Sequence, residues 1–161
     1  MDFYKQFALK NVLYFAWVAL ISTSLVPLIN MVSAPIIYQA LLATGVTVGS
    51  FGLVAYNAPS EKFLRLGGPL ALGLGGLLGT SMLSVINPGS LALYNTRLYG
   101  GLAVFSAFVL YDTQMILQKA KTQSSFDPIN EAIKIYLDAV NIFIKFVEVF
   151  ARSQSKKDRR D

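Results

Sequence analysis

The chain has 161 residues and contains no cysteine and no histidine. The absence of cysteine excludes disulfides, thiol catalysis and thiolate metal sites. The absence of histidine excludes imidazole ligands, a Ser-His-Asp triad and the usual side chain that titrates near neutral pH. Any proton or cation chemistry therefore depends on carboxylates, amines, hydroxyls or backbone carbonyls. These groups favour protons or hard cations such as Ca²⁺ over transition metals.

Charge is also scarce, since 14% of the residues are charged and 54% are hydrophobic. Residues 11–60 and 66–96 contain no Asp, Glu, Lys or Arg at all. The first of these runs has room for two membrane spans of about 20 residues each. The basic residues, which give a net charge of +5, flank apolar segments, so membrane topology explains them better than nucleic-acid binding does. The sequence predicts an all-α membrane protein.

Prolines, glycines and charges divide the chain, which we interpret as one membrane domain over residues 1–161. The four expected spans are 11–29, 36–56, 67–86 and 98–118, followed by a helix over 129–150 and a basic tail over 151–161. Glycines at a four-residue interval, Gly45 and Gly49, and the glycines of the third span (Gly73, Gly75, Gly76 and Gly79) have the spacing that allows close helix packing.

The helix over 129–150 differs from the spans because its polar residues recur at helical spacing. They are Glu131, Lys134, Asp138, Asn141, Lys145 and Glu148. Intervals of three and four residues place them on one face, and such a face must meet protein, water or the interface. If this helix enters the bilayer and returns, nearly all basic residues share one side, as the positive-inside tendency prefers. We therefore expect a re-entrant or half-inserted helix, with both termini on the same side.

Two acids at membrane depth, Asp112 and Asp138, are the candidate functional residues, because carboxylates in hydrocarbon are costly and usually functional. In a common cavity both cannot ionise cheaply, so the pair would share a proton and would attract a cation after losing it. Possible supporting hydrogen-bond donors are Thr113, Gln114 and Asn141. The alternative is that each acid pairs separately with a lysine, Asp112 with Lys119 and Asp138 with Lys134 or Lys145.

Several motifs resemble the transmembrane BAX-inhibitor-motif family over about residues 11 to 151. They are APSEKF at 58–63, the segment from YGGL at 99–102 to YDTQ at 111–114, and the segment from DPIN at 127–130 to IYLDAVNIF at 135–143. The resemblance is closest to the mitochondrial branch of the family. It implies a helical bundle with a semi-inserted last helix, a di-aspartyl pH sensor, and Ca²⁺ leak or Ca²⁺/H⁺ exchange. In that comparison Asp112 and Asp138 match the two sensor acids.

The chain departs from the family pattern in two respects. Members of the family have about seven spans, and the four spans and last helix of this chain correspond to the family pattern without its first two spans. The arginine that latches the family's acid pair comes from that region, and no residue here obviously replaces it.

The leading hypothesis is a proton-linked Ca²⁺ pathway, with Ca²⁺ and H⁺ as transported ions, no cofactor and no enzymatic activity. One alternative is an anti-apoptotic membrane protein that acts through helix contacts without transport. A remote one is an intramembrane aspartyl protease: Tyr111 and Asp112 fit its first half, but Asp138 lacks the Gly-x-Gly approach of its second. The expected partners are the lipid bilayer, a second copy or another membrane subunit, and no nucleic acid. The mitochondrial inner membrane is favoured, with the endoplasmic reticulum or Golgi as other possible locations.

Overall fold

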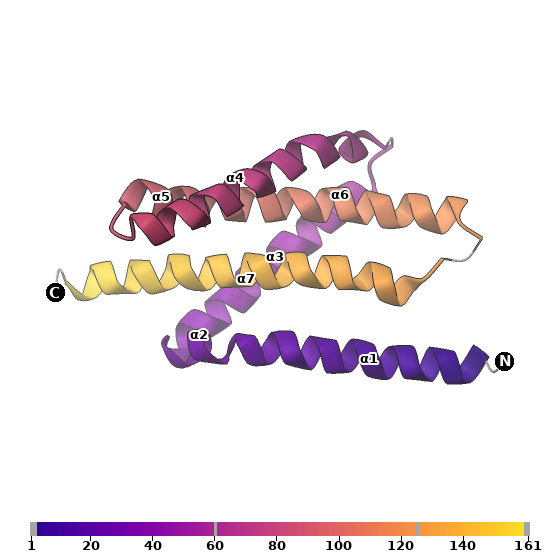
Figure 1. Cartoon of the computed structure of the whole chain (residues 1–161), viewed down its shortest axis with the longest axis horizontal. Coiled ribbons are helices and arrows are strands. Elements are labelled where there is room, and N and C mark those ends of the chain that lie inside the picture. The colour runs from indigo at the N-terminus through magenta and orange to yellow at the C-terminus, as the bar shows by residue number, and fades with distance from the viewer. Residues whose placement is uncertain (1–2, 60, 125, 160–161) are drawn as a thin grey trace.

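The computed structural model describes residues 3–59, 61–124 and 126–159, and these are helical with no strand among them (Figure 1). The elements are α1 (Phe3–Ser24), α2 (Val26–Asn30), α3 (Ala34–Tyr56), the 3₁₀ turn η1 (Lys62–Leu66), α4 (Gly67–Ile86), α5 (Leu91–Asn95), the π-helical turn η2 (Thr96–Gly100), α6 (Gly101–Thr122) and α7 (Pro128–Asp158).

Four helical segments of the described chain are long and apolar enough to cross a membrane. They are Phe7–Asn30, Ala34–Tyr56, Lys62–Ile86 and Leu91–Thr122. The prediction of an all-α membrane protein with four spans is therefore confirmed. The fourth segment begins earlier than the expected residue 98, because α5, η2 and α6 follow one another without a break.

Helix starts coincide with prolines, which fit the first turn because no backbone N–H is needed there. Pro27 lies in the first turn of α2, Pro35 in that of α3, and Pro128 begins α7. Asp127 caps α7, since its Oδ1 accepts hydrogen bonds from the backbone N–H groups of Ile129 (3.2 Å) and Asn130 (3.4 Å). These local signals set the turns that bring the helices together.

The core lies where α3, α6 and α7 pack on one another. Ile36 and Ala40 of α3 form a buried cluster with Phe143 and Val147 of α7. In Figure 1, α6 and α7 run side by side, α3 crosses them at an angle, and α1 lies along the other side of α7. Many large apolar side chains face outward, among them Met31 and Val85, each 83% exposed. An outer surface of this kind fits hydrocarbon.

The sequence predicts a re-entrant or half-inserted last helix, and α7 is not among the four segments that are long and apolar enough to cross a membrane. α7 is unbroken over 31 residues, so at 1.5 Å per residue it is about 45 Å long. It starts at the loop after α6, and the Arg152 side chain near its other end bonds to Asn95. The N- and C-termini lie at opposite ends of the bundle (Figure 1). α6 and α3 both pack against α7, and Asp138 on its polar face is buried.

Most of the glycines expected to pack closely face open space instead. A Cβ atom built at Gly45, Gly49, Gly75, Gly76 or Gly79 would meet no atom of the described chain within 4 Å. Gly73 is the exception in that group, because its Cβ would lie 3.1 Å from Cγ2 of Val104 on α6. At the start of α4, a Cβ built at Gly67 would likewise lie 3.1 Å from Cε2 of Tyr111, so α4 approaches α6 closely at both glycines.

Candidate functional site

Asp112 of α6 and Asp138 of α7 meet inside the bundle. Their residues are 9% and 6% exposed, and their carboxyl groups lie close enough to interact electrostatically. An ionised carboxylate can only accept hydrogen bonds, so a bond between two carboxyl groups would need a proton on one of them. Two acids placed in this way could share one proton. We call this pair the aspartate dyad.

The lysines considered as partners of these acids form ion pairs with glutamates. Lys119 and Lys134 both bind Glu131, with N–O distances of 2.7 and 2.8 Å. Lys145 binds Glu148 at 3.3 Å. The alternative in which each aspartate has its own lysine partner is therefore not the arrangement found.

Glu131 begins the polar face of α7 beside the loop that follows α6, outside the four spanning segments. Partial burial opposes its charged form, but the hydrogen bonds from Lys119 and Lys134 outweigh that effect and hold the Glu131 pKa below its usual value. Glu131 therefore stays ionised and holds both lysines in ion pairs. The helical spacing places Glu131 on the polar face of α7 but does not reveal these partners.

One oxygen of the dyad has no protein partner. Oδ2 of Asp138 is buried, and no hydrogen-bond donor of the described residues reaches it. Buried polar atoms are nearly always paired, so an orphaned carboxylate oxygen requires an explanation. Such an oxygen can accept a proton, a water molecule or a hard cation.

The three expected supporting residues have other contacts. Gln114 is 5% exposed, accepts a hydrogen bond from the Phe63 backbone N–H (2.8 Å) and donates to the Ala55 carbonyl (3.4 Å). It thus ties α6 to the segments on either side of the α3–η1 loop. Thr113 faces α3, where its Oγ1 lies 3.9 Å from the point that a Cβ atom added to Gly52 would occupy. Asn141 donates to the Leu137 carbonyl of its own helix (2.8 Å).

The site does not have the composition of a resident metal centre. Within residues 3–59, 61–124 and 126–159, no three or more Asp, Glu, His or Cys side chains are grouped so that they could hold an ion. Two carboxyl groups are few for Ca²⁺, which takes six to eight oxygen ligands in proteins.

The polar face of α7 continues beyond the residues singled out from the sequence. Arg152 follows Glu148 at the same spacing, and its guanidinium carbon lies 5.3 Å from the centre of the Tyr94 ring. The spacing could have assigned Arg152 to this face, but the sequence analysis placed it in the basic tail. Oε2 of Glu148 is the other buried side-chain oxygen of the described chain without a hydrogen-bond partner.

Comparisons with known proteins match most of the chain. Residues 1–155 match the family model described as "Inhibitor of apoptosis-promoting Bax1". The chain is 38% identical over 138 residues to growth hormone-inducible transmembrane protein of Rattus norvegicus. The aligned region covers 80% of this chain and 40% of that protein. It is 34% identical over 128 residues to Bax inhibitor 1 of Homo sapiens, covering 80% of this chain and 53% of the other.

A plant protein is also similar: Bax inhibitor 1 of Arabidopsis thaliana is 28% identical over 149 residues, which cover 91% of this chain and 60% of that protein. The chain thus spans about half the length of the curated relatives it matches. No solved structure matches the chain.

Proposed function

Because this chain belongs to the Bax inhibitor 1 family of membrane proteins, we propose that it carries a pH-sensitive Ca²⁺ leak or Ca²⁺/H⁺ exchange pathway gated by the aspartate dyad. The observation that carries the proposal is the contact between two buried acids on different helices. Asp112 and Asp138 are buried close enough to interact with each other, while the nearby lysines form ion pairs with Glu131 and Glu148.

The proton acts as a latch between α6 and α7. With one proton shared, the dyad carries one negative charge and its hydrogen bond holds the two helices together. Losing that proton removes the bond and leaves two like charges in a medium of low dielectric constant, where repulsion is strong. The deprotonated state therefore favours separation of the helices, or a cation between them.

Ca²⁺ suits the deprotonated state because it prefers carboxylate oxygens. Oδ2 of Asp138, which has no partner in the described chain, is the first oxygen available to it. The binding must be weak enough for the ion to leave, and two carboxylates without further ligands meet that condition. Competition between H⁺ and Ca²⁺ for the same oxygens would couple the flux to pH.

Flux measurements on the purified full chain in liposomes test this function. We expect Asp112→Asn and Asp138→Asn each to reduce Ca²⁺ flux by roughly tenfold or more, the scale of losing one charge-assisted interaction, and to flatten its dependence on pH. Both substitutions are nearly isosteric, so the fold should survive.

Asp158→Asn is the matched control, because Asp158 lies exposed near the end of the same helix. It should keep the wild-type flux and pH profile. Wild-type behaviour of both dyad variants would show that the acids are structural and that the gate lies elsewhere.

We also propose that the chain suppresses apoptosis, as the description of the matching family states for its members. Transport and protection can be separated by expressing Asp138→Asn in cells under an apoptotic stimulus. Loss of protection together with flux supports the transport function. Protection that persists without flux supports the alternative, a membrane protein acting through helix contacts.

The location that we propose is the mitochondrial inner membrane, because the motifs resemble the mitochondrial branch most closely. Fractionation with protease protection distinguishes it from the endoplasmic reticulum and Golgi. Assembly with a second copy or with another membrane subunit is a further part of the proposal. It is supported by the open glycine faces at Gly45, Gly49 and Gly75, where another helix can approach closely.

A further inference from the structure

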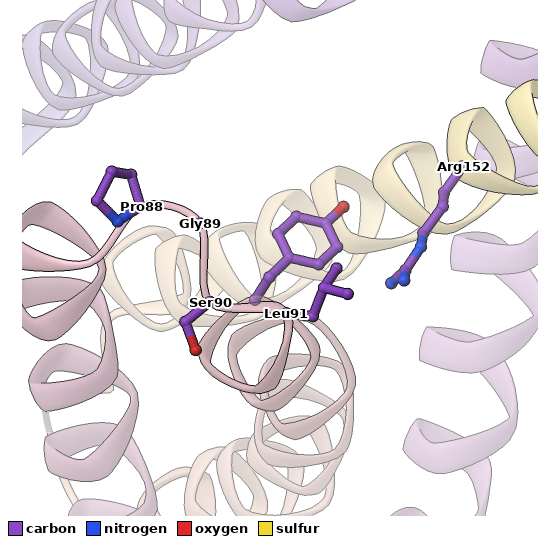
Figure 2. A pocket seen from close by; sticks show the side chains of 6 residues that line it. Pro88, Gly89, Ser90, Leu91 and Arg152 are labelled. Carbon is purple, nitrogen blue, oxygen red and sulfur yellow. The ribbon is translucent and has the colours of Figure 1, made fainter.

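A second candidate site lies at the end of the bundle away from the α6–α7 loop. A pocket of about 330 Å³ is lined by Pro88, Gly89, Ser90, Leu91, Tyr94 and Arg152. In Figure 2, Arg152 extends from α7 toward the turn formed by Ser90 and Leu91. The pocket thus joins the α4–α5 turn to the last part of α7, and the gating hypothesis makes no use of it.

Arg152 is held in place by two neighbours. Its Nη1 donates a hydrogen bond to Oδ1 of Asn95, and its guanidinium carbon lies 5.3 Å from the centre of the Tyr94 ring. The guanidinium of Arg97 lies 6.0 Å from the same ring. The bond to Asn95 uses one of five N–H donors that arginine carries in a planar fork suited to phosphate.

The charge around the pocket is positive. Lys156 and Lys157 are exposed on the turns of α7 that follow Arg152, and Arg159 is exposed directly after its end, with Asp158 as the one acid among them. The nearest acid on α7, Glu148, is engaged by Lys145 at 3.3 Å. The field at this end of the bundle therefore favours an anion.

The pocket borders the α4–α5 turn, where lipid headgroups are expected. The α4–α5 turn separates two segments long and apolar enough to span a membrane, Lys62–Ile86 and Leu91–Thr122. Around that turn Val85, Ile86 and Leu91 are 83%, 82% and 67% exposed. A basic group next to exposed apolar surface fits an amphiphile, whose phosphate meets Arg152 while its acyl chains cover these side chains.

We propose that this pocket binds the phosphate of an anionic phospholipid, with Arg152 as the anchoring residue and Tyr94 holding the guanidinium in place. The site is independent of the aspartate dyad. A lipid bound here bridges the α4–α5 turn and α7, and so fixes the end of α7 against the bundle.

Native mass spectrometry of the purified full chain in nonionic detergent measures this binding directly. The probes are dioleoylphosphatidylglycerol, which is anionic, and dioleoylphosphatidylcholine, which is zwitterionic. Wild-type protein should retain the anionic lipid more tightly. Arg152→Gln should weaken that binding by about 20-fold, the scale of a lost hydrogen bond to a charged group, and leave phosphatidylcholine binding unchanged.

Arg159→Gln is the matched control, because it removes the same charge from the exposed end of α7. A diffuse surface charge is worth about fivefold, so this variant should lose no more than that. If Arg152→Gln and Arg159→Gln weaken binding of the anionic lipid equally, the lipid is held by general attraction to the basic tail and not by the pocket. Displacement of the lipid by an equal concentration of inorganic phosphate would show that the site takes free anions, and either result overturns the proposal.

A second pair of variants keeps the test decisive if Arg152→Gln folds poorly. Leu91 is exposed at the mouth of the pocket, so Leu91→Glu adds a repelling charge without disturbing the core. It should abolish the preference for the anionic lipid, whereas Leu91→Gln should keep it. Unchanged phosphatidylglycerol binding by Leu91→Glu contradicts the site.

Discussion

Glu131 shows how a single side chain sets the electrostatics around the dyad. Lys119 and Lys134 lower its pKa, so its ion pairs stabilise the folded state fully above the usual glutamate pKa of about 4.3 and lose that contribution as the pH falls through the lower value in the fold. We expect the thermal unfolding midpoint in detergent to fall on acidification below this range. Glu131→Gln should lower the unfolding midpoint near neutral pH. It should also make the midpoint depend less on pH in the acidic range.

Glu61→Gln is the control for this effect, since Glu61 is exposed and accepts one hydrogen bond, from Gln118 (3.3 Å). If the midpoint of Glu131→Gln falls on acidification as much as that of the wild type, other carboxyl groups cause the acid sensitivity.

At the scale of an element, α4 approaches α6 closely at two glycines, Gly67 beside Tyr111 and Gly73 beside Val104. A methyl group at Gly73 would lie 3.1 Å from Cγ2 of Val104, and the β-branched valine has few rotamers available to move away. Gly73→Ala should therefore destabilise the bundle by about 1 kcal/mol, after a gain in helix propensity offsets part of the overpacking. The thermal unfolding midpoint in detergent measures this.

Gly75→Ala provides the comparison, because a methyl group there meets no atom within 4 Å. It should leave the isolated chain as stable as the wild type or slightly more stable. If both alanine variants behave alike, the α4–α6 contact does not depend on Gly73.

At the scale of the whole molecule, the direction of α7 decides the topology. The Asp127 cap and its ion pair with Lys10 lie at one end of α7, and the contacts of Arg152 with Tyr94 and Asn95 lie at the other. Since the hydrocarbon core is about 30 Å thick, a helix of about 45 Å can cross it. We expect tags at the two termini to be accessible from opposite faces of sealed vesicles, as protease digestion would show.

Equal accessibility of both tags would mean that α7 tilts out of the bundle in a membrane and returns to the side it started from. That result would favour the positive-inside tendency over the packing of α7 against α3 and α6.

The sequence by itself determined where the helices are, because their signals are local. The charge-free runs predicted four spans, Pro35 and Pro128 predicted where helices begin, and the three-and-four spacing placed Asp138 and Glu131 on one face of α7. The two acids were found in the same way, since a carboxylate at membrane depth stands out against its apolar neighbours.

Only the tertiary structure decided which of these groups meet. Sequence spacing allowed Asp112 to pair with Lys119 or with Asp138. The fold places Lys119 in an ion pair with Glu131 and buries Asp112 close to Asp138. It also carries α7 to the far end of the bundle, where Arg152 reaches the pocket beside Tyr94. Pairings between helices depend on rotation and depth relative to a neighbour. Those quantities result from packing over the whole bundle, and no local pattern contains them.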